Sequence, residues 1–321
     1  MSDRPLVSVL FTSYKHETYL RECLDSALNQ TYENVEVIVV DDNSPDSSPE
    51  ILRSYGERVR LVQNEQNRGT YGVLNQALEL ARGKYAAVLN SDDAWLPKKI
   101  ELQVALMESD PAMAFCHTFG DFIDEDGNVI GGKPMGFEFP RTPTGDLLPL
   151  FIERNHAIAS SVMMRADMAR MAGGFDESFR NIGDWDMWLR LAAKGTVGFV
   201  DEKLTFYRVH SHNTIYRFQT SLSEDIRIRL GVLERRRELL HKWPALRKQL
   251  AHAAACLATE EVMAGDPRKG RELYLLSLQL HPGRFKSVLR YLATLAPKPI
   301  RSRIFKPPEA PAWLPHSAET H

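Results

Sequence analysis

Cysteine is scarce in this sequence, with only Cys23, Cys116 and Cys256 among 321 residues. Three scattered cysteines suit neither a disulfide framework nor a zinc site, which is typical of a reducing compartment. Long apolar runs are also missing, since no stretch approaches the roughly 18 apolar residues of a membrane span. The first residues, Met-Ser-Asp-Arg-Pro, lack the basic and then apolar pattern of a secretory signal. We therefore expect a cytoplasmic globular protein.

Glycine is absent from the loop that follows the first apolar run. Residues 6–12 are predicted to form a buried strand, and the next loop reads Thr12-Ser-Tyr-Lys-His-Glu17. A dinucleotide-binding fold needs glycines at this point, because its backbone closely approaches a pyrophosphate. A nucleotide-binding oxidoreductase is therefore a poor match for this sequence.

Acidic residues are few in the C-terminal third of the chain. Residues 226–306 hold 18 Lys and Arg against 6 Asp and Glu, a net charge of +12, whereas residues 1–225 hold 22 against 34, a net charge of −12. The basic segment suggests an anionic partner, although solvated helix faces would explain it equally well. An anionic membrane surface fits better than nucleic acid, because aromatic residues do not interleave with the basic ones.

Predicted strands and helices alternate through the first half of the chain. Strands are expected at 6–12, 35–40, 59–62 and from Tyr85 onward, with helices between them, and 43% apolar residues are ample for a core. This alternation indicates right-handed crossovers and a largely parallel, doubly wound α/β sheet. A hairpin over 115–130, a strand over 159–164, a helix over 184–194 and strands over 197–207 are expected to complete the sheet.

The pattern changes to helices alone from about residue 220. We expect a catalytic domain over residues 1–218, a basic helical extension over 219–306 and a disordered tail over 307–321, which contains four prolines. The extension carries the basic run Arg235-Arg-Arg237.

Two adjacent carboxylates, Asp92 and Asp93, follow the apolar run that begins at Tyr85. The carboxyl ends of parallel strands open into the crevice where ligands bind, and paired carboxylates there suit a hard divalent cation. The alternative is that one of them caps the helix expected to begin near Pro97 or Lys98. The two residues alone leave both interpretations open.

Five motifs occur in order through residues 5–215. They are Thr12-Ser-Tyr14, Asp41-Asp-Asn-Ser44, Asn67-Arg-Gly69, Ser91-Asp-Asp93 and Gly183-Asp-Trp-Asp-Met-Trp-Leu-Arg190. Together they closely resemble family 2 glycosyltransferases of the GT-A fold. The resemblance implies a nucleotide-binding α/β sandwich joined to an acceptor-binding half. It also implies a metal-dependent transfer that inverts the anomeric centre of a nucleotide sugar.

The resemblance also assigns roles to the residues that hold the nucleotide. Thr12, Tyr14 and Asp41 would bind the nucleoside, with the Tyr14 ring as a stacking face and the Asp41 carboxylate accepting from a base N–H. Arg68 would lie nearby. The alternative for residues 41–44 is an ordinary turn, since Asp, Asn and Ser favour turns.

The same resemblance implies which residues would bind the metal. Asp92 would reach the ribose or the metal, and Asp93 would hold Mg²⁺ or Mn²⁺ with the donor diphosphate. His210 follows the last expected strand and could ligate the metal as a neutral imidazole. An ordinary surface histidine after a strand is the alternative.

Asp184 would be the general base that takes the proton from the acceptor hydroxyl. Many relatives carry an acidic residue just before this base, and this sequence has Gly183 there. Asp186 is a weaker candidate for the base, because residues two apart on a helix point to different sides. Asp184 could otherwise serve only as the N-cap of its helix.

The resemblance implies an inverting transferase that uses a UDP- or dTDP-sugar as donor. The acceptor would be a glycan or a lipid-linked saccharide of cell-surface polysaccharide synthesis, and the basic extension would hold the enzyme at the inner face of the membrane. A catalytically silent scaffold protein that acts through its basic helices is the alternative. Metal-dependent hydrolysis of a nucleotide sugar would separate the two.

Overall fold

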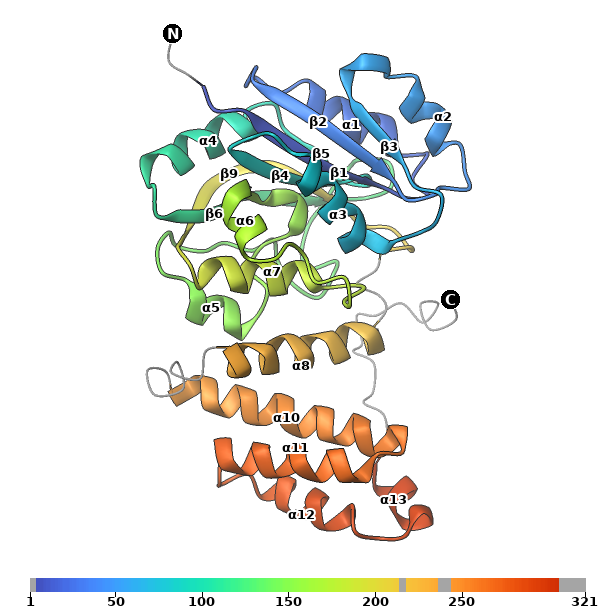
Figure 1. The fold of residues 1–321 in the computed structure, drawn as a ribbon, viewed down its shortest axis with the longest axis vertical. Coiled ribbons are helices and arrows are strands. Elements are labelled where there is room, and N and C mark those ends of the chain that lie inside the picture. The colour runs from blue at the N-terminus through green and yellow to red at the C-terminus, as the bar shows by residue number, and fades with distance from the viewer. Residues whose placement is uncertain (1–3, 214–217, 236–243, 306–321) are drawn as a thin grey trace. The chain divides into compact units, whose positions relative to one another are not determined.

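The computed structural model describes residues 4–213, 218–235 and 244–305 (Figure 1). The chain divides into two compact units, Met1–Asn213 and Thr214–His321, whereas the sequence had placed the end of the catalytic domain at residue 218. The expected disordered tail, residues 307–321, and most of the basic run at 235–237 lie outside the described residues.

The first unit is built on one curled sheet that is parallel in its first half. The sheet order is β3-β2-β1-β4-β8-β6-β9-β5, with β7 paired to β6. The strands are β1 (Val7–Ser13), β2 (Val35–Asp41), β3 (Arg60–Gln63), β4 (Tyr85–Asn90), β5 (Ala94–Trp95), β6 (Met113–Ile123), β7 (Val129–Ile130), β8 (Met163–Arg165) and β9 (Thr196–Arg208). The helices are α1 (Leu20–Leu28), α2 (Ser48–Arg53), α3 (Gly69–Leu80), α4 (Lys99–Ser109), α5 (Leu148–Glu153), α6 (Ala166–Met171) and α7 (Gly183–Ala192).

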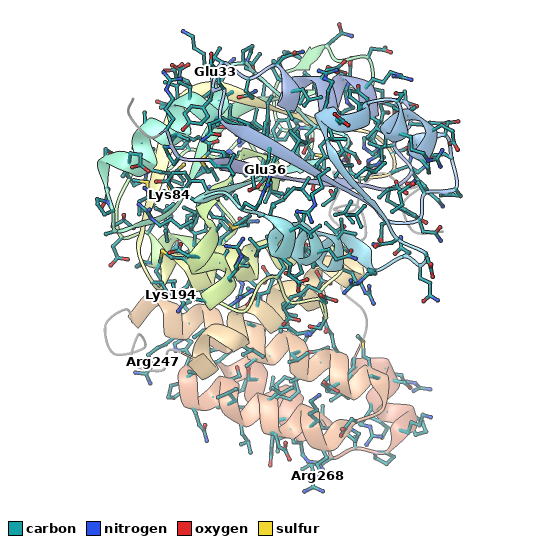
Figure 2. All side chains as sticks on the ribbon, turned by 45° about the horizontal axis from the view of Figure 1, so that its top comes forward. Glu33, Glu36, Lys84, Lys194, Arg247 and Arg268 are labelled. Atoms are coloured by element: carbon teal, nitrogen blue, oxygen red, sulfur yellow. The ribbon has the colours of Figure 1, made fainter. Side chains whose placement is uncertain are left out.

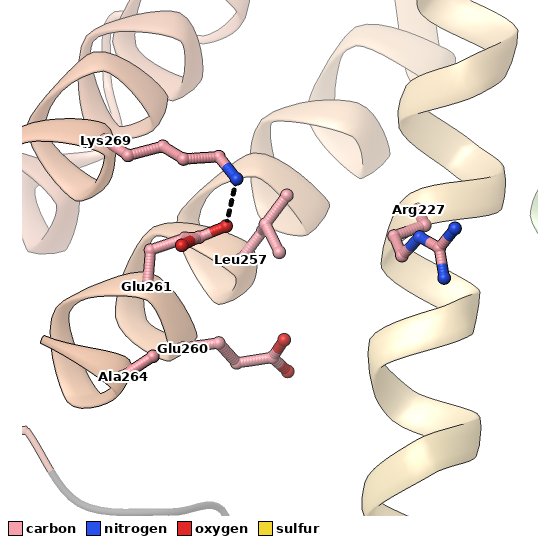
Figure 3. Close-up of a pocket in the computed structure, with 6 residues that line it drawn as sticks. All are labelled: Arg227, Leu257, Glu260, Glu261, Ala264 and Lys269. Carbon is pink, nitrogen blue, oxygen red and sulfur yellow. Dashed lines mark ion pairs between the residues drawn. The ribbon is translucent and has the colours of Figure 1, made fainter. Parts of the chain in front are cut away.

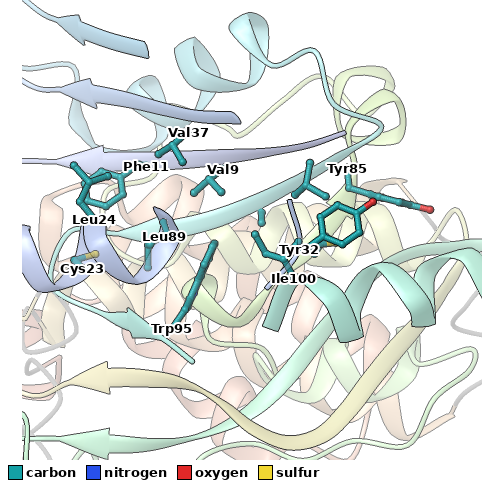
Figure 4. Packing of buried hydrophobic residues seen from close by; sticks show 14 of the residues in the cluster. Val9, Phe11, Cys23, Leu24, Tyr32, Val37, Tyr85, Leu89, Trp95 and Ile100 are labelled. Carbon is teal, nitrogen blue, oxygen red and sulfur yellow. The ribbon is translucent and has the colours of Figure 1, made fainter. Parts of the chain in front are cut away.

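The apolar periodicity of the sequence explains the main core. Every residue of β1 is buried, as a strand covered on both faces requires. On α1 the buried residues recur at helical spacing, namely Leu20, Cys23, Leu24 and Ala27. They pack against β1, β2 and β4 and against the ring of Trp95 (Figure 4). Cys23, Cys116 and Cys256 are free thiols.

Parallel pairing brings the polar strand ends to one edge of the sheet. Thr12 of β1 is paired with Val40 of β2 and with Asn90 of β4, and Ser13 is paired with Asp41. The residues that follow these strands therefore begin at the same edge. This register confirms the predicted doubly wound arrangement and fixes where a ligand site can form.

One local expectation is wrong, and one of the alternatives left open by the sequence is excluded. The expected strand over 159–164 is only Met163–Arg165, because a 3₁₀ turn, Ala159–Ser161, precedes it. Neither Asp92 nor Asp93 caps a helix: β5 intervenes, and α4 begins at Lys99 without a side-chain cap. The two carboxylates thus have no capping role that would explain them.

Arg208, the last residue of β9, ties the residues after β4 to the rest of the unit. Its side chain is 1% exposed. Its Nε donates to the carbonyl oxygen of Asp92 at 2.9 Å, and its Nη1 donates to the carbonyl oxygen of Asp124 at 3.0 Å. Its Nη2 lies 2.6 Å from Oε2 of Glu22 on α1. One buried guanidinium therefore joins four segments at the carboxyl edge of the sheet.

The second unit is helical in its described part. Its helices are α8 (Phe218–Arg235), α10 (Pro244–Ala264), α11 (Pro267–Leu280), α12 (Phe285–Ala293) and α13 (Lys298–Ile304). Tyr274 and Phe305 are buried against α10 at residues such as Ala258. Within the described ranges, none of the helices has the length and apolarity to cross a bilayer.

The surface of the helical unit carries charged side chains as well as exposed apolar ones. Arg247 and Arg268, for example, are exposed (Figure 2). A cavity of about 340 Å³ lies among α8, α10 and α11 (Figure 3). Its lining carries both signs of charge and includes an ion pair of 2.5 Å between Lys269 and Glu261. None of the predicted donor-site residues borders it.

Lys99 makes the stability of the first unit depend on pH. Its amine is buried, lies 3.9 Å from the centre of the Trp95 ring and donates to Oε1 of Gln103 at 2.8 Å. Burial lowers the pKa of Lys99 from its usual 10.5 to about 7. Between pH 7 and pH 10.5 the amine of Lys99 is therefore protonated in the unfolded chain and neutral in the folded chain. This group therefore makes the free energy of unfolding rise with pH by about 1.4 kcal/mol per unit.

We predict that Lys99→Met removes this contribution. Urea unfolding at pH 7.5 and pH 9 should show a smaller rise in stability for the variant than for the natural chain, by about 2 kcal/mol. Lys98→Met is the matched control, because Lys98 is exposed. Equal pH dependence in Lys99→Met and Lys98→Met would contradict the prediction.

We also predict that Arg208→Met destabilises the first unit. The substitution removes a donor from the carbonyl oxygens of Asp92 and Asp124 and an ion-pair partner from Glu22, at a cost of about 3 kcal/mol in the free energy of unfolding. Arg21→Met, at an exposed position on α1, should change it by less than about 0.5 kcal/mol. Urea unfolding measures the free energy of unfolding of both variants. Similar losses in the two would show that the contacts of Arg208 do not stabilise the first unit.

Candidate functional site

The loops after β1 and β2 form one wall of the site. Thr12 Oγ1 donates to Oδ1 of Asn90 at 3.2 Å, and Ser13 Oγ donates to Oδ1 of Asp41 at 3.0 Å. Lys15 and Asn43, one in each loop, have left-handed backbone conformations with φ of 57° and 62°. Such conformations in non-glycine residues store strain and gather at functional sites. The structure thus brings the predicted residues Thr12 and Asp41 together.

Asp41 also forms the turn that the sequence allowed. Its carboxylate accepts from the backbone N–H of Ser44 at 3.1 Å and from the Ser44 hydroxyl at 2.7 Å, in addition to Ser13. The residue is 1% exposed. These bonds fix the loop after β2, while the predicted contact of Asp41 with a nucleoside stays a prediction.

Tyr14 and Arg68 are more exposed than Thr12 and Asp41. Tyr14 is 39% exposed, which leaves its ring accessible for stacking. Arg68 precedes α3, and its Nη2 lies 3.8 Å from Oε2 of Glu177, with 44% and 47% of the two side chains exposed. A surface pair of this kind contributes little to stability, so Arg68 can exchange its partner for a ligand at low cost.

Asp42 is a site-organising residue that the sequence analysis did not single out. Its carboxylate accepts from the backbone N–H groups of Arg68 and Gly69, each at 2.8 Å, and from Nδ2 of Asn64 at 3.0 Å. It is 3% exposed. A carboxylate at a helix N-terminus is favoured by the helix dipole. Asp41 therefore fixes the loop after β2, and Asp42 fixes the start of α3. The only sequence signal for this role of Asp42 was its position next to Asp41.

The central cluster of the site consists of His16, Asp92 and His210. Each offers one possible ligand atom, and these three atoms lie within 4.8 Å of one another. His210 Nε2 is 3.2 Å from Oδ2 of Asp92. His16 Nδ1 is 2.8 Å from the Ser91 hydroxyl, which orients its ring. The structure thus joins two predicted residues, Asp92 and His210, and adds His16.

Burial and neighbouring charges set the protonation states of this cluster. Burial alone would raise the pKa of Asp92, but the hydrogen bond to His210 and the nearby His16 outweigh it and lower that pKa. Burial lowers the pKa of His16 below its usual range, against the opposing charge of Asp92. Asp92 is therefore ionised and His16 neutral at neutral pH, the protonation states that metal ligands need.

Asp93 points into the protein instead. It is 1% exposed, accepts from the Ser160 hydroxyl, and accepts from the backbone N–H of Arg208 at 3.1 Å. Burial, and then the charge of Asp92, raises its pKa well above the usual range. The predicted role of Asp93 as a metal ligand remains a prediction, and it would require these bonds to be exchanged.

Asp184 lies in the first turn of α7. Nδ2 of Asn155 donates to its Oδ2 at 3.2 Å. Burial raises the pKa of Asp184 to about 6, although hydrogen bonds oppose the shift. A carboxylate with such a pKa is suited to accept a proton near neutral pH. The N-cap of α7 is Ile182, so Asp184 is not the cap of its helix.

The neighbours of Asp184 are structural. A Cβ added at Gly183 would come within 2.6 Å of Cβ of Phe179 and 2.8 Å of the Tyr71 ring. Oδ2 of Asp186 accepts from Nε of Arg190 at 2.7 Å inside the protein. Packing therefore leaves no room for a second carboxylate at position 183. The carboxylate of Asp186, the other candidate for the base, is paired with Arg190.

Comparison with known proteins identifies the family. The model of the family described as Glycosyl transferase family 2 matches residues 8–171. An uncharacterised glycosyltransferase from Methanocaldococcus jannaschii is 32% identical over 214 residues, which is 64% of this chain and 72% of that protein. Chondroitin synthase from Escherichia coli is 33% identical over 214 residues, 65% of this chain and 30% of that protein.

Two solved structures share the fold. TarS from S. aureus, in complex with UDP-GlcNAc, has a TM-score of 0.59 at 17% identity and covers 90% of each chain. The mannosyltransferase PcManGT from Pyrobaculum calidifontis, in complex with GDP-Man and Mn²⁺, has a TM-score of 0.57 at 17% identity, with 94% of this chain and 84% of that chain covered. These likenesses, the family match and the sequence motifs agree, and the protein is a glycosyltransferase that belongs to glycosyl transferase family 2.

Proposed function

We propose that this enzyme moves a sugar from a nucleoside-diphosphate sugar to an acceptor hydroxyl, with a divalent cation and with inversion at the anomeric carbon. The observation that carries the proposal is the cluster of His16, Asp92 and His210 at the carboxyl edge of the sheet, where two imidazoles and one carboxylate gather. Parallel α/β sheets bind their ligands at this edge.

The cluster fits a divalent cation. Its three ligand atoms lie within 4.8 Å of one another, which is compact enough for one ion. Asp92 replaces Asp93 as the carboxylate ligand in this proposal, because the oxygens of Asp93 already accept from Ser160 and Arg208. Two imidazoles favour Mn²⁺ over Mg²⁺, since Mg²⁺ prefers oxygen ligands. When bound there, the cation would stabilise negative charge on the departing diphosphate.

The nucleoside would lie between the loops after β1 and β2 and the start of α3. In this proposal Thr12 and Asp41 hold the base and ribose, Tyr14 provides a stacking face and Arg68 lies beside the nucleotide. The exposure of Tyr14 and Arg68 supports it, since both side chains are accessible to a ligand. UDP- or dTDP-sugars are the proposed donors. TarS and PcManGT were solved with UDP-GlcNAc and GDP-Man.

Asp184 is the proposed general base. The acceptor oxygen would form a bond to the anomeric carbon as the bond from that carbon to the diphosphate breaks. The acceptor proton would pass to a carboxylate oxygen of Asp184. The bonding electrons would leave with the nucleoside diphosphate, and attack from the face opposite the diphosphate would invert the anomeric carbon. The raised pKa of Asp184, about 6, supports this role.

The acceptor in this proposal is a glycan or a lipid-linked saccharide of cell-surface polysaccharide synthesis. We place the enzyme in the cytoplasm, at the inner face of the membrane. The net charge of +12 over residues 226–306 supports electrostatic attraction to anionic lipid there.

We predict metal-dependent binding of one nucleoside diphosphate. A thermal-shift panel of UDP, dTDP, GDP and CDP, with and without Mn²⁺, should show one diphosphate that stabilises only with Mn²⁺. At 100 times its dissociation constant the ligand adds about 2.7 kcal/mol. Asp92→Asn should abolish this shift, whereas Asp126→Asn, in an exposed turn, should keep it.

The same panel separates the alternatives. If Asp93→Asn abolishes the Mn²⁺-dependent shift and Asp92→Asn does not, the metal ligand is Asp93, as the sequence first suggested. If no diphosphate stabilises the natural chain with Mn²⁺, the transferase mechanism loses its support. The catalytically silent scaffold then becomes the better account.

We predict that activity requires the ionised form of Asp184. Because the pKa of this base is raised to about 6, kcat/KM should be level above pH 7 and fall about tenfold per pH unit below pH 6. Asp184→Asn should lower kcat by about 10² to 10⁴, whereas Asp167→Asn, an exposed carboxylate on α6, should leave it unchanged. A loss below fivefold in Asp184→Asn would exclude this residue as the base.

A further inference from the structure

The outer face of α12 exposes large apolar side chains at helical spacing. Phe285, Leu289 and Leu292 are 69%, 52% and 55% exposed. Positions i, i+4 and i+7 lie on one side of a helix, so these three side chains form a stripe. Scattered apolar residues on a surface need no explanation, but a stripe on one helix face does.

The exposed apolar residues continue into the next helix. Leu295 lies in the connection to α13 and is 62% exposed, and Ile300 and Ile304, one helical turn apart, are 50% and 46% exposed. The inward side of the same segment is already used, since Thr294 and Phe305 are buried. The packing of the helical unit therefore accounts for one side of α12 and α13 and leaves their other side with apolar atoms in water.

The charge of this segment has one sign. Residues 281–305 contain six Lys and Arg and no Asp or Glu. Lys286, Lys298 and Arg303 are exposed. Arg284, Arg290 and Arg301 reach back to the unit, where they contact His252, Thr259 and the Thr294 carbonyl oxygen. An apolar stripe among cations, without acids, is the composition of helices that lie in the interface of an anionic bilayer.

We propose that the outer face of α12 and α13 docks on an anionic membrane by inserting Phe285, Leu289 and Leu292 below the lipid headgroups. The exposed cations of the segment would then lie at the level of the lipid phosphates. A second copy of the chain is a poorer occupant, because it would bring two sets of cations together without any acid to pair them.

This inference goes beyond electrostatic attraction by the basic helices. Charge alone acts at a distance and is screened by salt, whereas buried apolar area resists salt. The docking face therefore predicts a binding component that survives high ionic strength and depends on three named side chains. It does not depend on catalysis, so its failure would leave the proposed transfer reaction intact.

The test is sedimentation of the full chain with vesicles, without donor or metal. The natural chain should bind vesicles of phosphatidylcholine with phosphatidylglycerol more tightly than vesicles of phosphatidylcholine alone, and should keep part of that binding in high salt. The double variant Phe285→Gln, Leu289→Gln should bind at least tenfold more weakly and lose the salt-resistant part. Leu275→Gln, at an exposed leucine of α11, is the matched control and should bind as the natural chain does.

Several outcomes would overturn the inference. Equal affinity of the double variant and the natural chain would show that the stripe does not insert, and complete loss of binding in high salt would leave charge as the only attraction. Light scattering that shows a dimer of the natural chain and a monomer of the double variant would assign the face to a second copy. A second variant, Lys286→Gln with Lys298→Gln, should remove most of the preference for anionic vesicles. An unchanged preference for anionic vesicles would show that Lys286 and Lys298 do not contact the lipid phosphates.

Discussion

The parallel pairing of β1 with both β2 and β4 is the constraint on which the site depends. It sets the ends of three strands side by side, so that Thr12, Asp41 and Asn90 meet across neighbouring strands. Each strand is buried because apolar residues run along it, and each ends where the sequence becomes polar. The same pattern that builds the core therefore delivers polar groups to one edge.

Two adjacent carboxylates at this edge have opposite electrostatic environments. His210 and His16 keep the pKa of Asp92 low, whereas burial and the charge of Asp92 raise the pKa of Asp93. Arg208 holds both residues in place, because its backbone N–H donates to Asp93 and its guanidinium donates to the carbonyl oxygen of Asp92, although these contacts oppose the rise in the pKa of Asp93. Asp92 thus stays beside His210, while Asp93 anchors the loop to β9.

Much of the fold could be predicted because its signals are local. The strand and helix periodicities between residues 6 and 109, the polar ends of β1, β2 and β4, and the motifs shared with the family all lie within short stretches. The role of Asp184 as the base stays a prediction of the sequence motif, and burial raises the pKa of this carboxyl to about 6. The short strand β8 was overestimated, because the 3₁₀ turn at Ala159–Ser161 leaves no local signal.

Which of Asp92 and Asp93 is proposed as the metal ligand could not be decided from the sequence. It depends on a hydrogen bond between residues 115 positions apart, from Arg208 to Asp93, and on a hydroxyl from Ser160. His16 was missed for the same reason, since only the folded chain brings the loop after β1 beside Asp92. Long-range contacts of this kind leave no periodic pattern to read.

The central claim is that His16, Asp92 and His210 hold one divalent cation, and pulsed electron paramagnetic resonance of the Mn²⁺ complex tests it most directly. The account predicts nitrogen hyperfine couplings from two imidazoles, one of which disappears in His16→Gln and the other in His210→Gln. Bound Mn²⁺ that shows no nitrogen coupling in the natural chain would contradict the account, because the cation would then lie elsewhere.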